Sequence, residues 1–161
     1  MSAYRCLGVL CCVLVVTMVH RGNAVVVQLD LTGAWNVSNT ARQIHIPGKV
    51  PGSMYTALLD SSMIPDPYYR DNDVKLAWIA HDNWTYTRYF NVSSTIYKSQ
   101  SVLLVAEGVD TVSTVVINGQ HVGSTDNMFI KYTWEVKSYL SVTTAARPHH
   151  KQFSISDQCA V

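Results

Sequence analysis

Apolar and polar residues alternate with period two along most of this chain, which is the pattern of β-strands that bury one face in a core. Alternation over residues 29–37, continued by Ile44 and Ile46, predicts a first strand and its neighbour. Residues 84–90 alternate in the same way, and the continuous apolar run at residues 101–106 predicts a central strand. The chain is therefore expected to be mainly β.

A hairpin follows the central strand. The apolar run at residues 111–117 leads into Asn118-Gly119, and a second short run starts at Gln120. Asn-Gly between two apolar runs is the strongest short-range hairpin signal, so a tight turn is expected at Asn118. Residues 129–136 predict one more strand, which residues 137–140 close.

One short helix interrupts the strands. Ser53 can cap the free amides of residues 54–59, in which Met54, Ala57 and Leu58 recur at helical spacing. The prolines of Ile64-Pro65-Asp66-Pro67 stop this helix, because each forces its predecessor out of the helical region. An extended loop with aromatic and polar side chains is expected at residues 68–79, before the chain re-enters a strand.

Six or seven antiparallel strands with one short helix fit an all-β fold, a jelly-roll β-sandwich. We place the sandwich at residues 25–140 and expect it to be incomplete, as in a truncated chain. Residues 141–161 are then an atypical C-terminal tail, with at most one short strand at residues 153–156. A sandwich without its last strands leaves open sheet edges and an exposed core.

Residues 1–24 have the features of a secretory signal peptide. Arg5 opens a short basic region, an apolar run follows, and Gly22-Asn23-Ala24 supplies small residues where a signal peptidase cleaves. We expect cleavage after Ala24. The apolar run is too short to span a bilayer comfortably, which needs about 20 residues, so no stable membrane anchor is expected. A signal anchor is the alternative.

Removal of the leader changes the charge and the cysteine content. The 12 basic residues become 10 against 11 acidic ones, because Arg5 and Arg21 leave, and the net charge falls from +1 to −1. No basic surface for nucleic acid is therefore expected. Only Cys159 remains, so the mature chain can form no internal disulfide. Three acceptor triplets for N-glycosylation agree with the secretory route and begin at Asn36, Asn83 and Asn91.

Three stretches in order carry a resemblance to a known family. They are VPGSMYTALLDSSMIPDPYYRDNDVKLAWIAHDNWTYTRYF (residues 50–90), EGVDTVSTVVINGQHVG (residues 107–123) and DNMFIKYTWEV (residues 126–136). Together they resemble the amino-terminal domain of lysosomal β-mannosidases, members of the retaining glycoside hydrolase family that also contains β-galactosidase and β-glucuronidase. The resemblance covers residues 29–140, fades beyond them, and implies a galactose-binding-like sandwich.

The resemblance implies an accessory role in an enzyme that removes terminal β-linked mannose from oligosaccharides in the lysosome. In this family the first domain packs beside a catalytic barrel and helps to wall the sugar pocket. The candidate substrate-binding residues are Tyr69, Arg70, Asp71 and Asn72. Asn72 matches an asparagine of the family that faces the pocket, and an amide can both donate to and accept from sugar hydroxyls. Alternatively, Asn72 only caps the turn that follows it.

No catalytic residue is assigned in this chain. A retaining glycosidase needs two carboxylates about 5 Å apart, and in the family both are glutamates on the missing catalytic barrel. Glu107 and Glu135 are the only glutamates here, and neither matches. The chain alone is therefore expected to be inactive. No zinc spacing, phosphate loop or nucleophile elbow occurs, so neither a metal nor a cofactor is expected.

The alternatives are an independent secreted sandwich that acts as a lectin-like or interaction module, and a truncated product without function. Many all-β domains act as such modules, and the fold alone does not distinguish them from an enzyme's accessory domain. The tryptophans could offer sugar-stacking faces, but at strand spacing we expect them in the core. They are Trp35, Trp78, Trp84 and Trp134.

Overall fold

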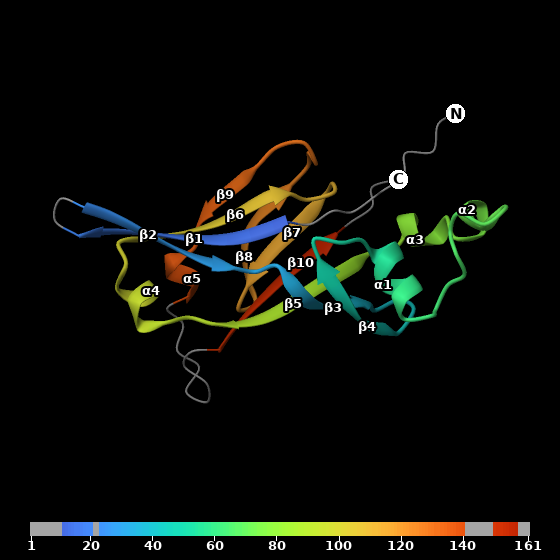
Figure 1. The fold of residues 1–161 in the computed structure, drawn as a ribbon, viewed down its shortest axis with the longest axis horizontal. Helices are drawn as coiled ribbons and strands as arrows, with labels where there is room; N and C mark the ends of the chain where they lie inside the picture. Colours follow the sequence, from blue (N-terminus) through green and yellow to red (C-terminus); the bar gives the residue numbers. More distant parts are fainter. Residues whose placement is uncertain (1–10, 21–22, 141–149, 158–161) are drawn as a thin grey trace.

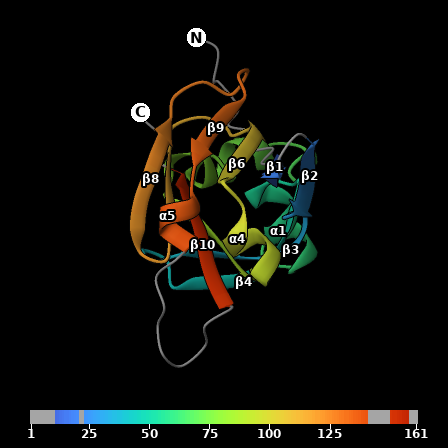
Figure 2. The ribbon, with the colours of Figure 1, turned by 90° about the vertical axis from the view of Figure 1, so that its left-hand side faces the viewer.

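The computed structural model describes residues 11–20, 23–140 and 150–157, and these form two antiparallel sheets (Figure 1). The four-stranded sheet contains, in order, β2 (Asn23–Asp30), β1 (Cys11–His20), β6 (Ser101–Gly108) and β9 (Tyr132–Glu135). The six-stranded sheet contains β4 (Ile44–Val50), β3 (Gly33–Asn39), β5 (Trp84–Asn91), β10 (His150–Asp157), β7 (Ser113–Ile117) and β8 (Gln120–Thr125). The predicted β-sandwich is confirmed, and Figure 2 shows it from its end.

The described residues include five short helices where the sequence predicted one. They are α1 (Met54–Asp60), α2 (Asn72–Lys75), α3 (Trp78–His81), α4 (Ser94–Lys98) and α5 (Lys137–Leu140). Because α2 to α5 have only four or five residues each, they are too short to leave a helical period in the sequence. The prediction of an extended loop at residues 68–79 is therefore wrong, because α2 lies within it and α3 begins within it. None of these helices is long and apolar enough to cross a membrane.

Helix α1 begins where the sequence predicted. The Ser53 hydroxyl accepts from the Thr56 amide at 3.2 Å, and the Thr56 hydroxyl accepts from the Ser53 amide at 3.1 Å. This reciprocal capping satisfies two of the free amides at the helix start. Met54, Ala57 and Leu58 are buried, so the apolar face of the helix covers one end of the sandwich.

The first alternating segment is split between two sheets, whereas the sequence predicted one strand. The Asp30 carboxylate accepts from the Thr32 amide at 2.8 Å and from the Thr32 hydroxyl at 2.7 Å. These hydrogen bonds hold the pKa of Asp30 below its usual value, and the bond from the Thr32 amide has the larger effect. Gly33 follows with φ +104°, a conformation that favours glycine. This turn ends β2 and starts β3, and Leu31 between them stays buried.

The hairpin of β7 and β8 turns at Asn118-Gly119, as predicted. Both residues have positive φ, 51° and 78°, as the two-residue turns of type I′ require. The Asn118 side chain also donates to the Tyr139 carbonyl at 2.8 Å and accepts from the Gln152 amide at 3.1 Å. The turn is thereby joined to α5 and to β10.

The core lies between the two sheets and contains two of the four tryptophans. Trp84 is fully buried, and Trp35 is in edge-to-face contact with Phe153, with ring centroids 5.4 Å apart. The expectation of core tryptophans is confirmed for Trp35 and Trp84, whereas Trp78 and Trp134 are partly buried and pack against the core from its rim.

Strand β10 corrects the expectation for the end of the chain. The sequence predicted at most a short strand at residues 153–156 in an atypical tail, but β10 has eight residues and pairs with β5 and β7 on its two sides. Phe153 and Ile155 are 1% and 0% exposed. The sandwich therefore takes in residues beyond Leu140. Residues 141–149 and Cys159 lie outside the described part of the chain.

Candidate functional site

The loop between α1 and α2 is closed by Asp66, which accepts hydrogen bonds from residues that follow it. Its carboxylate accepts from the Tyr68 amide at 2.9 Å, and its carbonyl oxygen accepts from the Tyr69 amide at 3.2 Å. The same carbonyl accepts from Asn72 Nδ2 at 2.8 Å. Residues 66–72 thus form a closed turn that projects from the end of the sandwich where α1, α2 and α3 gather (Figure 1).

Three of the four predicted substrate-binding residues lie together on the surface of this turn. Tyr69 is 57% exposed, and the Arg70 guanidinium lies 5.1 Å from the centroid of its ring. The Asp71 carboxylate accepts from Lys75 Nζ at 3.2 Å across one turn of α2, and both side chains are 65% exposed. Neighbouring Tyr68 is 82% exposed. The turn therefore presents two aromatic rings, a cation and a carboxylate to solvent.

Asn72 differs from the other three because its side chain is buried, with 8% exposed. Its amide nitrogen is committed to the Asp66 carbonyl, and it closes the turn that precedes α2. It starts α2 without capping it, since Asp71 holds the N-cap position. The geometry thus gives Asn72 a structural role close to the second interpretation, and its contact with a sugar stays a prediction.

A polar network connects α3 to the sandwich beneath the turn. Arg42 pairs with the Asp82 carboxylate, and its guanidinium lies 3.9 Å above the Trp78 ring centroid. Asn39 Nδ2 donates to the same carboxylate at 3.0 Å. These contacts join the end of α3 to the segment that follows β3. Asp82 is therefore a structural residue.

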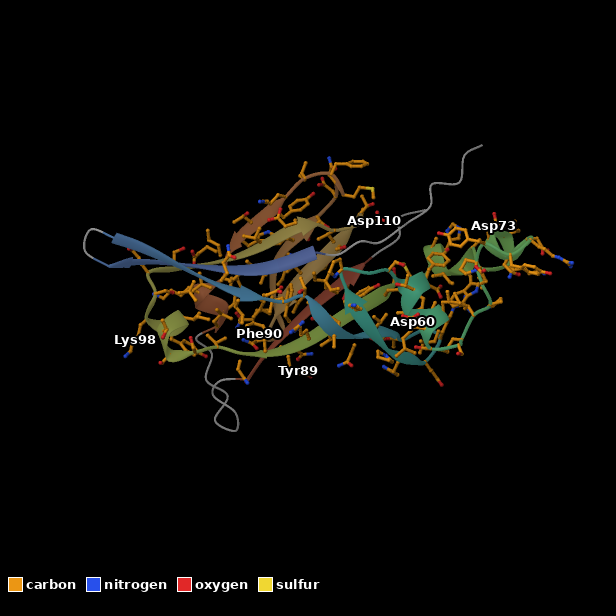
Figure 3. All side chains as sticks on the ribbon, viewed as in Figure 1. Asp60, Asp73, Tyr89, Phe90, Lys98 and Asp110 are labelled. Carbon is orange, nitrogen blue, oxygen red and sulfur yellow. The ribbon has the colours of Figure 1, made fainter. Side chains whose placement is uncertain are left out.

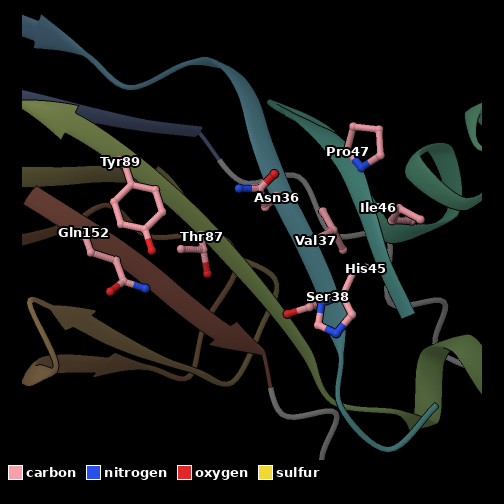
Figure 4. A pocket seen from close by; sticks show the side chains of 9 residues that line it. All are labelled: Asn36, Val37, Ser38, His45, Ile46, Pro47, Thr87, Tyr89 and Gln152. Carbon is pink, nitrogen blue, oxygen red and sulfur yellow. The ribbon is translucent and has the colours of Figure 1, made fainter. Parts of the chain in front are cut away.

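A second surface feature is a shallow hollow on the outer face of the six-stranded sheet (Figure 4). It encloses about 520 Å³, and its polar lining comes from β3, β4, β5 and β10. Those polar residues are Asn36, Ser38, His45, Thr87, Tyr89 and Gln152. The sequence analysis did not identify it. Alternation marks outward residues on each strand, but it does not tell which strands are neighbours.

The two glutamates lie in strands and do not form a catalytic pair. Glu107, in β6, pairs with Lys131 at 2.9 Å. Glu135, in β9, accepts from the Ser101 hydroxyl and, at 3.1 Å each, from the Val102 and Lys137 amides. Burial is the largest single influence on the pKa of Glu135, and it raises that pKa. The three hydrogen bonds together have a larger effect in the opposite direction, so the pKa lies below its usual value.

Side chains that commonly ligate metals are scattered over the described residues. His45 lines the hollow, His81 ends α3, and His121 Nε2 lies 3.2 Å from Ser124 Oγ on β8. In the part of the chain that the structure describes, no group of three or more histidine, cysteine, aspartate or glutamate side chains could hold a metal ion. Neither the turn nor the hollow therefore offers a recognisable metal centre.

The three acceptor asparagines are all exposed, in different surroundings. Asn83 lies in the link between α3 and β5, and Asn91 ends β5. Asn36 lies in the middle of β3, opposite Pro47 on one side and Thr87 on the other. A glycan on Asn36 would stand at the edge of the hollow, whereas one on Asn83 would stand beside α3.

Comparison with known proteins identifies the sandwich. Residues 35–153 match the glycosyl hydrolase 2 galactose-binding domain-like family. The chain belongs to this family. It is 41% identical to the goat (Capra hircus) β-mannosidase over 111 residues, which are 69% of this chain and 13% of that protein. A probable β-mannosidase of Caenorhabditis elegans is 31% identical over 134 residues, 83% of this chain and 15% of that protein. The chain thus spans a small part of these relatives.

Solved structures contain the same sandwich. The crystal structure of a β-D-mannosidase from Dictyoglomus thermophilum superposes with a TM-score of 0.72 and 29% identity, covering 81% of this chain and 15% of that one. A β-D-glucuronidase from the same organism gives a TM-score of 0.58 at 17% identity, covering 82% and 19%. The second likeness concerns the fold alone. The family resemblance found in the sequence is confirmed.

Proposed function

We propose that this chain is the amino-terminal accessory domain of a β-mannosidase-like glycoside hydrolase, whose whole protein removes terminal β-linked mannose from oligosaccharides. The β-mannosidases that match do so over the segment that contains the α1–α2 loop, and the chain spans 13% of the goat enzyme. The described residues contain no pair of glutamates suited to retaining hydrolysis. In this proposal the catalytic barrel lies elsewhere and is the partner of this domain.

The turn at residues 66–72 is the proposed contribution to the sugar pocket. The observation that carries it is the combination of a fixed backbone with exposed side chains: Asp66 and Asn72 close the turn, while Tyr69 and Arg70 stay on the surface. Aromatic rings stack on the apolar faces of sugars, and charged groups hydrogen-bond sugar hydroxyls strongly. A preformed wall loses little entropy when the sugar binds.

We also propose that residues 1–24 are a leader that directs the protein into the secretory pathway and, as for mammalian lysosomal enzymes, toward the lysosome. The basic start, the apolar run and the small residues before Val25 support this proposal. The exposed acceptor asparagines agree with it. Mass spectrometry of the secreted chain tests it: we expect a mature start at Val25, and a retained residue 1–24 segment would contradict it.

The hollow on the six-stranded sheet favours a second candidate function, a lectin-like module that binds sugar by itself. Its lining offers an exposed tyrosine ring, an imidazole and several amides and hydroxyls, from Tyr89, His45 and Gln152 among others. Such groups suit a carbohydrate in a shallow site. The hollow and the turn lie on different elements, so variants can distinguish the two functions.

The test is a graft in which residues 35–153 of this chain replace the matching domain of the goat enzyme. Tyr69→Ala in this graft removes one exposed ring of the turn, and Tyr89→Ala is the matched control in the hollow. We expect Tyr69→Ala to raise KM for a chromogenic β-mannoside about fivefold, since a stacked aromatic ring contributes about 1 kcal/mol.

Tyr89→Ala should leave KM and kcat unchanged. Equal KM values for Tyr69→Ala and the unaltered graft would contradict the role of the turn. If instead Tyr89→Ala alone abolished binding of free mannosides to the ungrafted chain, the lectin-like function would be preferred. Circular dichroism of each variant checks that the sandwich is retained.

A further inference from the structure

Strand β1 lies inside the four-stranded sheet, between β2 and β6 (Figure 1). It is antiparallel to both, and residues 13–17 pair with residues 26–30 on one side and with residues 101–105 on the other. The proposed leader therefore supplies an internal strand of the sheet. Its removal takes away a strand and leaves the strands on both sides.

Two strands lose hydrogen-bonding partners when residues 1–24 leave. β2 is at the edge of the sheet and pairs only with β1, so residues 25–30 keep no sheet neighbour. Val27 and Leu29 still pack against the core, which holds this segment near its place. β6 keeps β9 on its other side. The distance between β2 and β6 is two inter-strand spacings, about 9.5 Å, which fits one strand.

We propose that the mature chain accepts one extended, uncharged peptide strand between β2 and β6, antiparallel to both. This inference rests on the proposed leader and goes beyond the role of the turn. The occupant is a segment of another polypeptide or domain that completes the sheet by strand addition, in which backbone hydrogen bonds supply affinity and alternate side chains supply specificity.

The core below the opening determines the chemistry of the occupant. Val102, Leu104 and Ala106 of β6 are fully buried or nearly so, at 0%, 1% and 0% exposed. Residues directly opposite each other in an antiparallel pair project to the same face. The occupant therefore needs apolar side chains at three alternating positions. The β1 segment CCVLVVTMVH, which has no aspartate, glutamate, lysine or arginine, meets this composition.

The hydrogen bonds of β6 show which amides face the opening. The Val102 amide donates to Glu135 at 3.1 Å, and its carbonyl accepts from the Val136 amide at 2.8 Å, so both groups point toward β9. Along an antiparallel strand, the backbone amide and carbonyl groups of successive residues point alternately toward the two neighbouring strands. Leu103 and Val105 therefore direct their amides toward β1, while Leu104 directs its amide toward β9.

Amide hydrogen exchange on the secreted, processed chain tests the inference. We expect fast exchange at Leu103 and Val105 and slow exchange at Leu104, which is the internal control. The probe is a synthetic peptide of residues 12–18 with Cys12→Ala, which keeps an apolar side chain opposite Ala106, and with lysines added at both ends for solubility. It should slow exchange at Leu103 and Val105 at least tenfold and protect residues 25–30 as well.

The control peptide carries Val15→Pro, because Val15 is opposite Leu103 and proline cannot donate to it. It should give no protection. Open amides that neither peptide protects would overturn the inference. Slow exchange at Leu103 and Val105 without any peptide would also overturn the inference. It would mean that the opening has collapsed or that a second copy of the chain fills it, and sedimentation would reveal the second copy. If mass spectrometry finds residues 1–24 still attached, the leader proposal is refuted and this inference with it. That outcome is independent of the graft, which tests the role of the turn.

A second measurement applies if the processed chain aggregates. Residues 25–161 are produced in bacteria with residues 12–18 attached after Val161 by a long glycine-serine linker. The attached strand should raise the soluble fraction several-fold over the unextended chain, and the Val15→Pro form should not. Equal solubility of the two attached strands would overturn the inference, because it would leave strand pairing without effect.

Discussion

Replacing Asn72 by alanine should loosen the turn that carries the proposed sugar-binding residues. The Asn72 amide lies in a buried environment, 2.8 Å from the Asp66 carbonyl. A neutral hydrogen bond contributes about 0.5–1.5 kcal/mol net. The Asp66 carbonyl keeps a second donor, the Tyr69 amide at 3.2 Å, so it is not left without a partner. We therefore expect a loss of about 1 kcal/mol, in the middle of that range.

The assay is thermal unfolding of the full chain, followed by circular dichroism. A loss of 1 kcal/mol lowers the melting temperature of a domain of this size by about 2–4 °C. Exchange of the Tyr69 amide should also accelerate, because its acceptor belongs to the same turn. Asn72→Asp should cost more, since a carboxylate cannot donate to the carbonyl and instead faces it.

Asn83→Ala is the matched control, because Asn83 is an exposed asparagine in a nearby link. Its effect should stay within about 0.5 kcal/mol, as for most surface substitutions. An Asn72→Ala chain that melts at the temperature of the unaltered chain, with unchanged exchange at Tyr69, would refute the structural role of Asn72. The sugar contact would then be the preferred explanation for this residue.

Other changes test the packing, the electrostatics and the secretory route. Gly123→Ala places its Cβ 2.8 Å from Cδ1 of Trp134, so urea unfolding should show a loss of about 1–3 kcal/mol, and an unchanged midpoint would contradict this contact. Glu135→Gln should destabilise the chain by about 1 kcal/mol at neutral pH. Because the folded-state pKa of Glu135 is lowered, the stability difference should be fully present at pH values above the unfolded-state pKa. It should vanish as the pH falls through the folded-state pKa. Thermal melts at several pH values measure this dependence, and a difference that does not change with pH would contradict it. The Asn83→Gln chain, secreted from animal cells, should lose the mass of one glycan, and equal masses would show that this acceptor is unused.

Local patterns predicted the elements whose signals lie within a few residues. The Ser53 cap, the turn at Asn118-Gly119 and the β5 strand were all expected and are all present. Each depends on the chemistry of adjacent residues: a hydroxyl before a helix, two residues with positive φ, or strict alternation. Such signals can therefore be recognised without knowledge of the rest of the fold.

Features that depend on distant partners escaped the sequence analysis. Leu31 continues the alternation between β2 and β3, so nothing in the period revealed that the Asp30 turn sends the two halves to different sheets. Phe153 and Ile155 looked like a short strand, because their partners in β5 and β7 are tens of residues away.

The candidate site was predicted in part for the same reason. Tyr69, Arg70 and Asp71 are consecutive, so the sequence placed them together, and the structure has them on one exposed turn. The hydrogen-bond partner of Asn72 could not be predicted, because Asp66 lies six residues earlier, with Pro67 between them. Figure 3 shows side chains crowded at this end of the molecule, where Asp60 and Asp73 are labelled. The Asn72 amide is distinguished from its neighbours by its burial and by its hydrogen bond to the Asp66 carbonyl.

The most direct test of the central claim, that this sandwich is the accessory domain of a β-mannosidase-like enzyme, is turnover of a chromogenic β-mannoside by two proteins. The first is the purified chain, and the second is the goat enzyme that carries residues 35–153 of this chain in place of its own domain. We predict no turnover above a mock purification for the first, and kcat/KM within about tenfold of the goat enzyme for the second. Turnover by the chain alone, or a folded graft without activity, would contradict the account.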